Sequence, residues 1–393
     1  MLSLIHRNHY LFDDDISINN KFLKNEIQNS SFLVLGGAGT IGQAVTKQIF
    51  KRSPKKLHVV DISENNLVEL VRDIRSSYGY IKGDFKTFAL DIGSDEYDAF
   101  FNDDGEYDYV LNLSALKHVR SEKDPYTIMR MINVNIFNTE KTLVQSIKKG
   151  VKKYFCVSTD KAANPANIMG ASKLIMEMVV SKLSSKIDVS LARFANVAFS
   201  DGSLLHGFNQ RINKLQPIVA PTDIKRYFIV PKESGELCLI SCIFGNNRDI
   251  FFPKLNNELD LISFESIAKK YLEQKNLTPY LCNSENEARE MISKLDLSKH
   301  WPCYFSISDT TGEKGFEEFY TSEETLDMNK FKNIGIIKNS IKNNNDKVEY
   351  FREQIISIKK SNDYNRSKLI KIFEKTIPNL NHIEKNKFLD SKM

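Results

Sequence analysis

Cysteine is scarce in this chain, and its spacing argues against a cross-linked or zinc-binding protein. The 393 residues include five cysteines, an odd number, and no CxxC pair occurs; they are Cys156, Cys238, Cys242, Cys282 and Cys303. Disulfide frameworks and zinc sites rely on paired, regularly spaced cysteines. The sequence therefore predicts reduced thiols, no metal site and a cytoplasmic location.

Long apolar runs and an excess of one charge are also missing. No stretch of about 18 apolar residues occurs, and the first 20 residues lack the apolar run and small-residue cleavage site of a secretion signal. The 55 Lys and Arg side chains nearly balance the 50 Asp and Glu side chains, which leaves a net charge of +5. We therefore expect a soluble protein that neither inserts into a membrane nor binds nucleic acid.

What the chain does contain is a regular alternation of short apolar segments and amphipathic segments. The expected strands cover residues 31–35, 56–61, 87–91, 109–113, 153–158 and 189–194, and the expected helices cover 41–50, 64–76 and the region around 135–149. Strands that alternate with helices form right-handed βαβ units, which build a parallel, doubly wound sheet. The sequence therefore predicts an α/β protein with a Rossmann fold.

A glycine-rich turn lies between the first predicted strand and the first predicted helix. It reads Gly36-Gly37-Ala38-Gly39-Thr40-Ile41-Gly42, with GxxGxxG spacing. Gly36 allows a tight turn, Gly39 lets the backbone approach a pyrophosphate, and Gly42 lets the helix pack close to the strand. The helix N-terminus then offers free N–H groups to the phosphates. The motif predicts a dinucleotide site rather than a turn with a purely structural role.

Asp61 ends the second predicted strand, where a carboxylate can bind the adenosine ribose hydroxyls of NAD and repel the 2′-phosphate of NADP. The alternative is that Asp61 caps the following helix. Asp91, at the end of the third predicted strand, is expected to contact the adenine. The alternative for Asp91 is also a capping role, at the end of its strand. We predict NAD as the cofactor and keep NADP as the less favoured choice.

Around this core the composition changes, and four regions are expected. They are a polar N-terminal arm at 1–30, the NAD-binding Rossmann domain at 31–200, a smaller C-terminal substrate-binding region interleaved with it at 201–334, and a polar extension at 335–393. Residues 226–230, 249–252 and 261–275 are expected among the substrate-side elements. The extension is expected to be helical in part, at 350–359 and 367–374.

Two further predicted strands end in polar residues. The fourth runs into Ser114-Ala115-Leu116-Lys117-His118, the fifth runs into Ser158-Thr159-Asp160-Lys161, and Lys173 follows near the start of a helix. The carboxyl ends of parallel strands share one edge of the sheet, where open α/β folds bind ligands. An acid and two lysines are thus expected near the nicotinamide, where they could move protons. The structural alternatives are a surface Asp160–Lys161 ion pair and a solvated Lys173.

Several segments give the chain a specific resemblance. The segments GGAGTIG, SALKHV, STDKAANP, MGASK, RFANVAFSDGS and IKRYFIVPKESGELCL resemble those of extended short-chain dehydrogenases/reductases. Within that superfamily the chain is similar to nucleotide-activated N-acetylglucosamine 4,6-dehydratases of the CapD-like, bacillosamine and legionaminic acid type. The resemblance covers residues 31 to 325.

The resemblance implies a reaction and assigns roles in it. In the family, NAD+ takes a hydride from C4 of the sugar, C5 loses a proton, the C6 hydroxyl leaves as water, and the hydride returns to C6. By this resemblance Lys161 is the C5 base, Asp160 is the C6 acid, and Lys173 holds the nicotinamide ribose. Lys161 must be neutral to act as a base, so we expect burial or a neighbouring cation to lower its pKa.

One position departs from the common pattern. Most short-chain dehydrogenases carry a tyrosine as the C4-hydroxyl base where this chain has Met169, which cannot transfer a proton. Some members of the dehydratase family are similar in carrying methionine there. Asp160, or Thr159 acting with a water, is then the nearest candidate for the base. Met169 itself is expected to pack against the substrate or the nicotinamide.

Ligand contacts are expected along these segments. Arg193, Asn196 and Arg226 lie in segments that resemble the diphosphate-binding parts of the family, and an arginine fork suits phosphate oxygens. A structural ion pair is the alternative for Arg193, and a purely structural contact is the alternative for Lys117 and Asn135. The predicted substrate contacts are Lys117, Arg193, Asn196 and Arg226. The predicted cofactor contacts are Gly36, Gly39, Thr40, Ile41, Gly42, Asp61, Asp91, Ile92, Ser114, Ala115, Lys117, Asn135 and Lys173.

These observations predict a lyase that dehydrates UDP- or GDP-N-acetylglucosamine to the 4-keto-6-deoxy sugar nucleotide, for surface polysaccharide or legionaminic-type acid biosynthesis. The alternatives are a sugar-nucleotide 4-epimerase, a dehydratase that also inverts C5, and a catalytically silent NAD-binding protein, which only Met169 favours. The resemblance also implies a homo-oligomer that pairs through the helices flanking the fourth and fifth strands.

Overall fold

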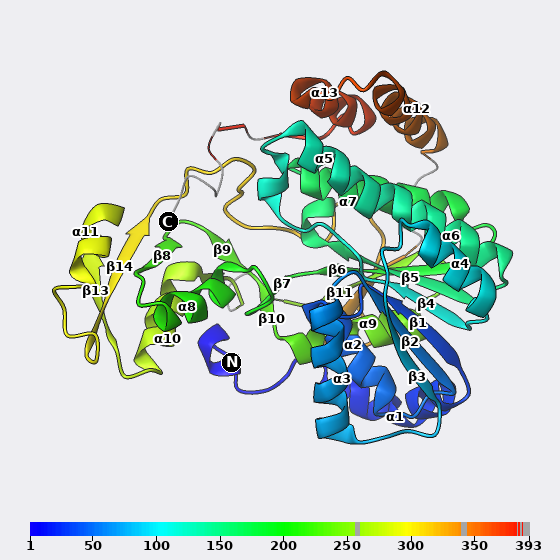
Figure 1. The fold of residues 1–393 in the computed structure, drawn as a ribbon, viewed down its shortest axis with the longest axis horizontal. Coiled ribbons are helices and arrows are strands. Elements are labelled where there is room, and N and C mark those ends of the chain that lie inside the picture. Colours follow the sequence, from blue (N-terminus) through cyan, green and yellow to red (C-terminus); the bar gives the residue numbers. More distant parts are fainter. Residues whose placement is uncertain (256–259, 339–343, 383, 386, 388–393) are drawn as a thin grey trace.

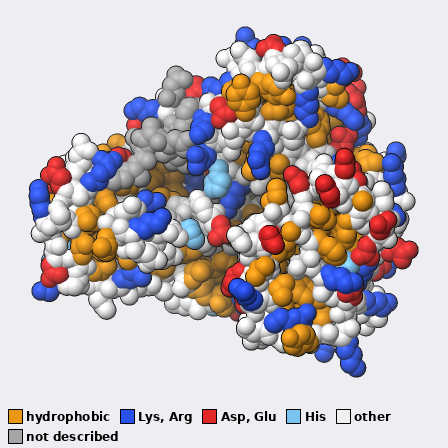
Figure 2. Space-filling view, viewed as in Figure 1, with side chains coloured by type: hydrophobic (Ala, Val, Ile, Leu, Met, Phe, Trp, Pro, Cys, Tyr) orange, Lys and Arg blue, Asp and Glu red, His pale blue; other side chains and the backbone are white. Residues whose placement is uncertain are grey.

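The computed structural model describes residues 1–255, 260–338, 344–382, 384–385 and 387 (Figure 1). The parts of the expected regions 201–334 and 335–393 that fall at 256–259, 339–343, 383, 386 and 388–393 lie outside the described residues. The described chain forms a large α/β part with a smaller part beside it (Figure 1). The surface between the two parts is hollowed, and Lys, Arg and His side chains lie around the hollow (Figure 2).

Nine strands form the large sheet, in the order β15-β16-β11-β6-β5-β4-β1-β2-β3. Their bounds are β1 Ser31–Leu35, β2 Lys56–Asp61, β3 Asp84–Ala89, β4 Tyr109–Asn112, β5 Lys153–Thr159, β6 Asp188–Phe194, β11 Asp249–Pro253, β15 Leu326–Asp327 and β16 Ile334–Ile337. The strands from β3 to β11 run parallel, while β16 pairs antiparallel with β11 and with β15. The strand order reverses between β1 and β4, and the carboxyl ends of the strands at such a point are where open α/β sheets bind ligands. The predicted Rossmann fold is confirmed.

Helices cover both faces of this sheet (Figure 1). One face carries α1 Asp13–Gln28, α2 Thr40–Phe50, α3 Glu64–Tyr78 and α9 Pro231–Phe244, and the other carries α4 Asp95–Asp104, α5 Pro125–Ile132, α6 Asn138–Lys148 and α7 Ile168–Leu183. Because both faces are covered, the central strands are apolar along their length, and Leu33, Val110 and Phe155 are fully buried.

The smaller part is built around a three-stranded parallel sheet, β13-β14-β8. Its strands are β8 Ile218–Pro221, β13 Thr278–Cys282 and β14 His300–Ser306, and its helices are α8 Leu204–Asn213, α10 Phe264–Glu273 and α11 Glu285–Met291. Two short ladders join it to the large part, β7 Asn196–Val197 with β10 Phe228–Ile229 and β9 Lys225–Arg226 with β12 Ile262–Ser263. This part has its own core, in which Trp301 is buried.

Three expected elements differ from the structure. The third strand begins and ends earlier than residues 87–91, and residues 249–252 form β11 of the large sheet, beside β6, rather than a substrate-side element. The helix expected around 135–149 begins earlier, as α5, and continues through a π-helical turn at Asn133–Phe137 into α6. Asp124 explains the early start, since its side chain accepts a bond from the Thr127 N–H and Pro125 occupies the first helical position.

The N-terminal arm is ordered rather than loose. A 3₁₀ turn at Leu2–Ile5 buries Leu4 and Ile5 in the core of the smaller part. Farther along, Arg7 pairs with Glu233 at 2.7 Å, and the buried Asp15 of α1 accepts bonds from the backbone N–H groups of residues 332 and 333. The arm therefore binds the two parts of the molecule to each other.

The C-terminal extension forms two helices, α12 Asn345–Ser361 and α13 Arg366–Thr376, which pack over α5 and α7 (Figure 1). Phe351 of α12 and Phe373 of α13 are buried and meet edge to face, with 5.1 Å between ring centroids. The helices α5 and α7, which α12 and α13 cover, flank β4 and β5, and the family resemblance implied that subunits associate through helices at this place. The oligomeric state stays a prediction.

The extension should contribute to stability through Phe373. Replacing Phe373 with Ala leaves a cavity between α12 and α13 and should lower the free energy of unfolding by about 3 kcal/mol. Ile356→Ala on the exposed side of α12 is the matched control and should change it by less than about 0.5 kcal/mol. Urea unfolding measures both, and equal losses would show that α12 and α13 are not packed as described.

Candidate active site

The glycine turn is too crowded for side chains at three of its positions, and a Cβ at Gly37 would lie 2.3 Å from the Val59 side chain. Gly36 has a φ of +71°, and a Cβ there would lie 2.7 Å from the backbone nitrogen of Ser114. A Cβ at Gly42 would lie 2.2 Å from the carbonyl oxygen of Gly36. Gly39 caps the N-terminus of α2, where an added Cβ would meet only the Gly36 oxygen, at 3.7 Å. The turn therefore presents bare backbone and a helix N-terminus, which suits a pyrophosphate.

Asp61 connects this turn to the end of β2. Its Oδ2 accepts a bond of 2.9 Å from the Ala38 N–H, and its Oδ1 accepts one of 2.9 Å from the Ser63 N–H. Ser63, not Asp61, is the N-cap of α3. The helix-cap alternative for Asp61 is therefore wrong, and its ribose role stays a prediction.

Other predicted cofactor contacts lie around the same crevice. Asp91 follows β3, is exposed, and accepts a bond from the Gly93 N–H, while its neighbour Ile92 is buried. Thr40, in the first turn of α2, accepts a bond of 3.1 Å from the Asp201 N–H, which brings the segment after β7 to the glycine turn.

Asn135 holds the loop that follows β4. Its Oδ1 accepts a bond from the Leu116 N–H, and its Nδ2 donates to the Leu116 oxygen and to the Ser172 hydroxyl. The side chain is fully buried in the π-helical turn. Both amide protons are thus used within the protein, which supports the structural alternative for Asn135 over a direct cofactor contact.

That loop also carries Lys117, whose ammonium lies 3.4 Å from the Ser200 hydroxyl. Burial lowers the pKa of Lys117, although the charge of Asp201 opposes the shift. The segments at 114–118 and 198–202 therefore meet across the crevice.

The residues predicted to move protons lie at the carboxyl end of β5. Asp160 is 2% exposed, and its Oδ1 accepts bonds from the Thr159 hydroxyl at 2.8 Å, the Lys161 N–H at 2.9 Å and the Lys161 ammonium at 3.1 Å. The structure therefore brings the three predicted residues together around the buried Asp160, with Thr159 and Lys161 partly buried. The burial of Asp160 excludes the surface ion pair considered as an alternative.

The charge of Lys161 differs from the expectation. Burial lowers the pKa of Lys161, but the charges of Asp160 and Glu317 outweigh burial, so that the pKa is raised above its ordinary value. The prediction that burial or a neighbouring cation lowers the pKa of Lys161 is therefore wrong. The sequence argument lacked Glu317, whose carboxylate lies 4.0 Å from the Lys161 ammonium.

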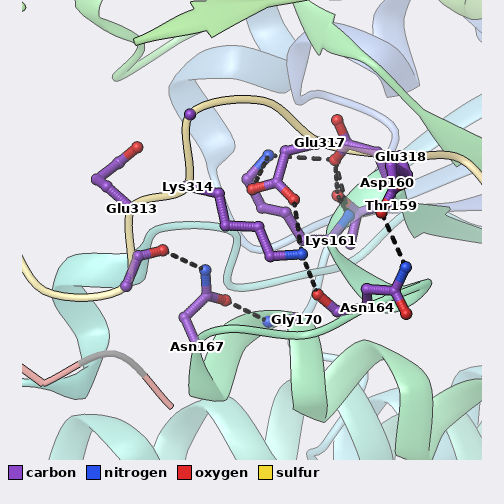
Figure 3. A network of polar contacts seen from close by, with 12 residues as sticks. Thr159, Asp160, Lys161, Asn164, Asn167, Gly170, Glu313, Lys314, Glu317 and Glu318 are labelled. Carbon is purple, nitrogen blue, oxygen red and sulfur yellow. Dashed lines mark hydrogen bonds and ion pairs between the residues drawn. The ribbon is translucent and has the colours of Figure 1, made fainter. Parts of the chain in front are cut away.

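Glu317 belongs to a segment between β14 and β15 that sequence reasoning left without a role. This segment crosses the site, and Figure 3 shows its charged side chains reaching toward Lys161 and Asn164. Lys314 donates to the Asn164 carbonyl, and the Gly312 carbonyl accepts a bond of 3.0 Å from Asn167. The only local signal was the dense run of charge in Glu313-Lys314-Gly315-Phe316-Glu317-Glu318.

The start of α7 is held from several sides. Asn167 caps it by accepting a bond from the Gly170 N–H, and the fully buried Glu122 accepts bonds from the N–H groups of Ile168 and Met169. Met169 is buried. Farther along the helix, Lys173 donates to the Val157 carbonyl at 3.0 Å, and burial lowers its pKa.

The two predicted substrate arginines are engaged within the protein. The guanidinium of Arg193 donates four hydrogen bonds, to Glu177, Glu324 and the Phe319 carbonyl, and a further oxygen of Glu324 lies 3.0 Å from it. Burial lowers its pKa, but Glu177 and Glu324 outweigh burial and raise it. These contacts favour the ion-pair alternative for Arg193, so we assign it no substrate contact.

Arg226, in β9, is 4% exposed and pairs with Glu313 at 2.5 Å. Asn196, in β7, lies between the two arginines along the chain, and its backbone N–H donates to the Tyr227 carbonyl.

A cavity of about 530 Å³ lies in the smaller part. It shares Gly202 and Glu313 with the segments above, and its other walls come from α8, β8 and the residues after β14. A cavity of this size, largely apolar with a few polar groups, suits a small organic ligand.

Among the described residues, no group of three or more His, Cys, Asp or Glu side chains could hold a metal ion. Within the same residues, none of the helices has the length and apolar character needed to cross a membrane.

Comparison with known proteins gives the chain a family. A family model described as polysaccharide biosynthesis protein matches residues 32–339. A protein of Methanocaldococcus jannaschii described as an uncharacterized membrane protein is 30% identical over 260 residues, 63% of this chain and 75% of that protein. The capsular polysaccharide biosynthesis protein CapD of Staphylococcus aureus is 29% identical over 63% of this chain, which spans only 42% of CapD.

Some of the relatives have named activities. A UDP-N-acetylglucosamine 4,6-dehydratase (inverting) of Campylobacter jejuni is 27% identical over 57% of this chain and 67% of that enzyme. A UDP-glucose 4-epimerase of Rickettsia rickettsii is 27% identical over 75% of this chain and 79% of that enzyme.

Solved structures share the fold. Pen from Bacillus thuringiensis superimposes with a TM-score of 0.64 at 23% identity and covers 86% of this chain and 98% of Pen. WbmF from Bordetella bronchiseptica, solved with NAD+, has a TM-score of 0.51 at 17% identity and covers 63% of this chain and 79% of WbmF.

The glycine turn yields a direct test. Gly42→Ala should push α2 away from the turn and weaken dinucleotide binding by roughly tenfold, about 1.4 kcal/mol. The measurement is a fluorescence titration with NADH. Gly207→Ala in α8 is the control, because nothing lies within 4 Å of an added Cβ there. Equal affinity in the two variants would remove the glycine turn from the proposed binding site.

Proposed function

Because the chain belongs to the polysaccharide biosynthesis protein family, we propose that it is an NAD-dependent sugar-nucleotide 4,6-dehydratase that acts on UDP- or GDP-N-acetylglucosamine. The observation that carries this proposal is the Thr159-Asp160-Lys161 cluster at the carboxyl end of β5, in which Asp160 is buried. It lies on the edge of the sheet that also carries the glycine turn, where open α/β folds bind their ligands. The dehydratase and the epimerase among its relatives support the same substrate class.

The glycine turn and the crevice fit a dinucleotide. The bare backbone from Gly36 to Gly42 would hold the pyrophosphate, Asp61 the adenosine ribose, and Lys173 the nicotinamide ribose. The carboxylate of Asp61 favours NAD over NADP, because it would repel a 2′-phosphate. When bound, the nicotinamide supplies the hydride acceptor for C4 and the hydride donor for C6.

The protein's own groups would move the protons. Asp160 would protonate the leaving C6 hydroxyl, and Lys161, once neutral, would remove the C5 proton. Met169 has no proton to exchange, so deprotonation of the C4 hydroxyl falls to Asp160 or to Thr159 acting with a water. The 2.8 Å bond from the Thr159 hydroxyl to Asp160 supports a short relay between these two groups.

The cavity in the smaller part would hold the nucleotide. Glu313, which lines it, belongs to the same segment as Glu317, whose carboxylate lies 4.0 Å from the Lys161 ammonium. A ligand that extends from the cavity along this segment would bring its sugar toward Asp160. Arg226 is the candidate for the diphosphate, provided that Glu313 yields its place. The nucleotide of the substrate is UDP or GDP in this proposal, and the product would feed surface polysaccharide or legionaminic-type acid synthesis.

The reaction is tested with UDP-N-acetylglucosamine and, separately, GDP-N-acetylglucosamine in deuterated water. Mass spectrometry should show the loss of about 18 mass units, and NMR should show solvent deuterium at C5. Asp160→Asn should lower kcat at least roughly 100-fold, because general acid catalysis is lost. Asp188→Asn, at the opposite end of the sheet on β6, is the matched control and should keep its activity.

The rival functions give different outcomes. A 4-epimerase would leave the mass unchanged and invert C4, and a dehydratase that also inverts C5 would give the other C5 configuration. A silent NAD-binding protein would change neither sugar. Absence of reaction with both sugars, on protein shown to hold NAD, would contradict the proposal.

A further inference from the structure

The segment between β14 and β15 places a glutamate beside the proposed base. Glu317 is 3% exposed, so its carboxylate is buried with the cluster rather than in solvent (Figure 3). The proposed proton transfers to and from the sugar use Asp160, Lys161 and Thr159 and give Glu317 no task. A buried carboxylate at this position therefore needs its own account.

Lys161 lies between two carboxylates that come from different parts of the chain. Asp160 Oδ1 lies 3.1 Å from the Lys161 ammonium, and Glu317 Oε1 lies 4.0 Å from it. The cations facing this group are Arg226 and Lys314, and the Lys314 ammonium lies 3.9 Å from the second oxygen of Glu317. Opposite charges at these distances favour the charged form of the lysine.

The same segment also contacts Arg226, through Glu313, which lies four residues before Glu317. Glu313 pairs with the Arg226 guanidinium at 2.5 Å, and the carbonyls of residues 314 and 315 accept further bonds from it at 2.9 and 3.2 Å. Glu313 also lines the 530 Å³ cavity. A carboxylate on an arginine fork occupies the place that a phosphate would take, so an anionic ligand in the cavity must compete with Glu313.

We propose that Glu317 is a positioning residue that keeps Lys161 charged in the free protein. Glu313 couples this ion pair to the substrate, because Glu317 stays beside Lys161 only while Glu313, and not a diphosphate, occupies Arg226. When phosphate oxygens replace Glu313, the segment is released from Arg226 and Glu317 moves away from Lys161. The Lys161 ammonium then gives its proton to water and becomes an amine. The base is therefore formed only when the substrate is present.

The identity of the diphosphate as a sugar nucleotide rests on the proposed function, but the charge coupling does not. Burial raises the pKa of Glu317, and Lys161 acts in the opposite direction. Removing the negative charge of Glu317 leaves Lys161 with Asp160 alone and must lower the pKa of the lysine. The neutral fraction of Lys161 at a fixed pH then rises.

The experiment measures that neutral fraction without turnover. Full-length protein is treated with trace acetic anhydride at about pH 9, where only neutral amines react, and acetylation of Lys161 is followed by peptide mass spectrometry. Glu317→Gln should acetylate Lys161 about tenfold faster than the unchanged protein, since a nearby opposite charge shifts a pKa by about one unit. Glu318→Gln is the matched control, because its carboxylate accepts a bond from Asn164 and faces solvent.

Glu313→Gln tests the coupling. It weakens the hold of the segment on Arg226 without touching Lys161, and it should also speed acetylation of Lys161. Combining it with Glu317→Gln should add nothing further, because both changes remove the same interaction. Glu317→Asp, which keeps the charge, should return acetylation toward the rate of the unchanged protein.

The outcomes separate this inference from the proposed function. Acetylation of Lys161 at an unchanged rate in folded Glu317→Gln overturns the role of Glu317, and an unchanged rate in Glu313→Gln overturns the coupling. If Glu317→Gln does not fold, the Glu313→Gln rate decides the question. With active enzyme, the rising limb of kcat, which reports the bound state, should lie at lower pH than that of kcat/KM. A protein that turns over neither sugar contradicts the proposed function and leaves the acetylation result standing.

Discussion

The rest of the site depends on one interaction, in which the Lys161 ammonium lies between the carboxylates of Asp160 and Glu317. Taking the charge of Lys161 out of water is costly, and that cost is offset only because Asp160 and Glu317 both lie close to it. Asp160 comes from the end of β5, whereas Glu317 arrives from the segment that follows the smaller part. The pairing therefore brings the segment that follows the smaller part to the edge of the large sheet, and Glu313 of this segment also lines the cavity.

The start of α7 is the second element that this arrangement requires. A Cβ at Gly170 would lie 2.5 Å from the Lys161 carbonyl, so the helix packs directly against the cluster. Glu122 holds the first turn of α7, and His382 from the C-terminal extension lies 3.0 Å from the same carboxylate. The extension thus supports α7, the helix that carries Lys173, through the contact of His382 with Glu122.

Much of the fold was predictable because local patterns encode it. The apolar runs of β1, β2, β4, β5 and β6 lie where predicted, since a parallel sheet covered on both faces requires continuous apolar strands. The early start of α5 was also readable from Asp124 and Pro125 but was missed. The place of β11 was not readable, because an apolar run does not reveal which sheet it joins.

The site divides in the same way. The sequence by itself determined the glycine turn and the residues that end β4 and β5. The spacing of the glycines is required only where a strand, a turn and a helix pack closely together. Only the tertiary structure decided that Arg193 pairs with Glu177 and Glu324, that Asn135 bonds to the loop after β4, and that Asp160 and Glu317 raise the pKa of Lys161. The reason is physical: desolvation and Coulomb interaction depend on distances between groups that are remote along the chain, and no local pattern contains those distances.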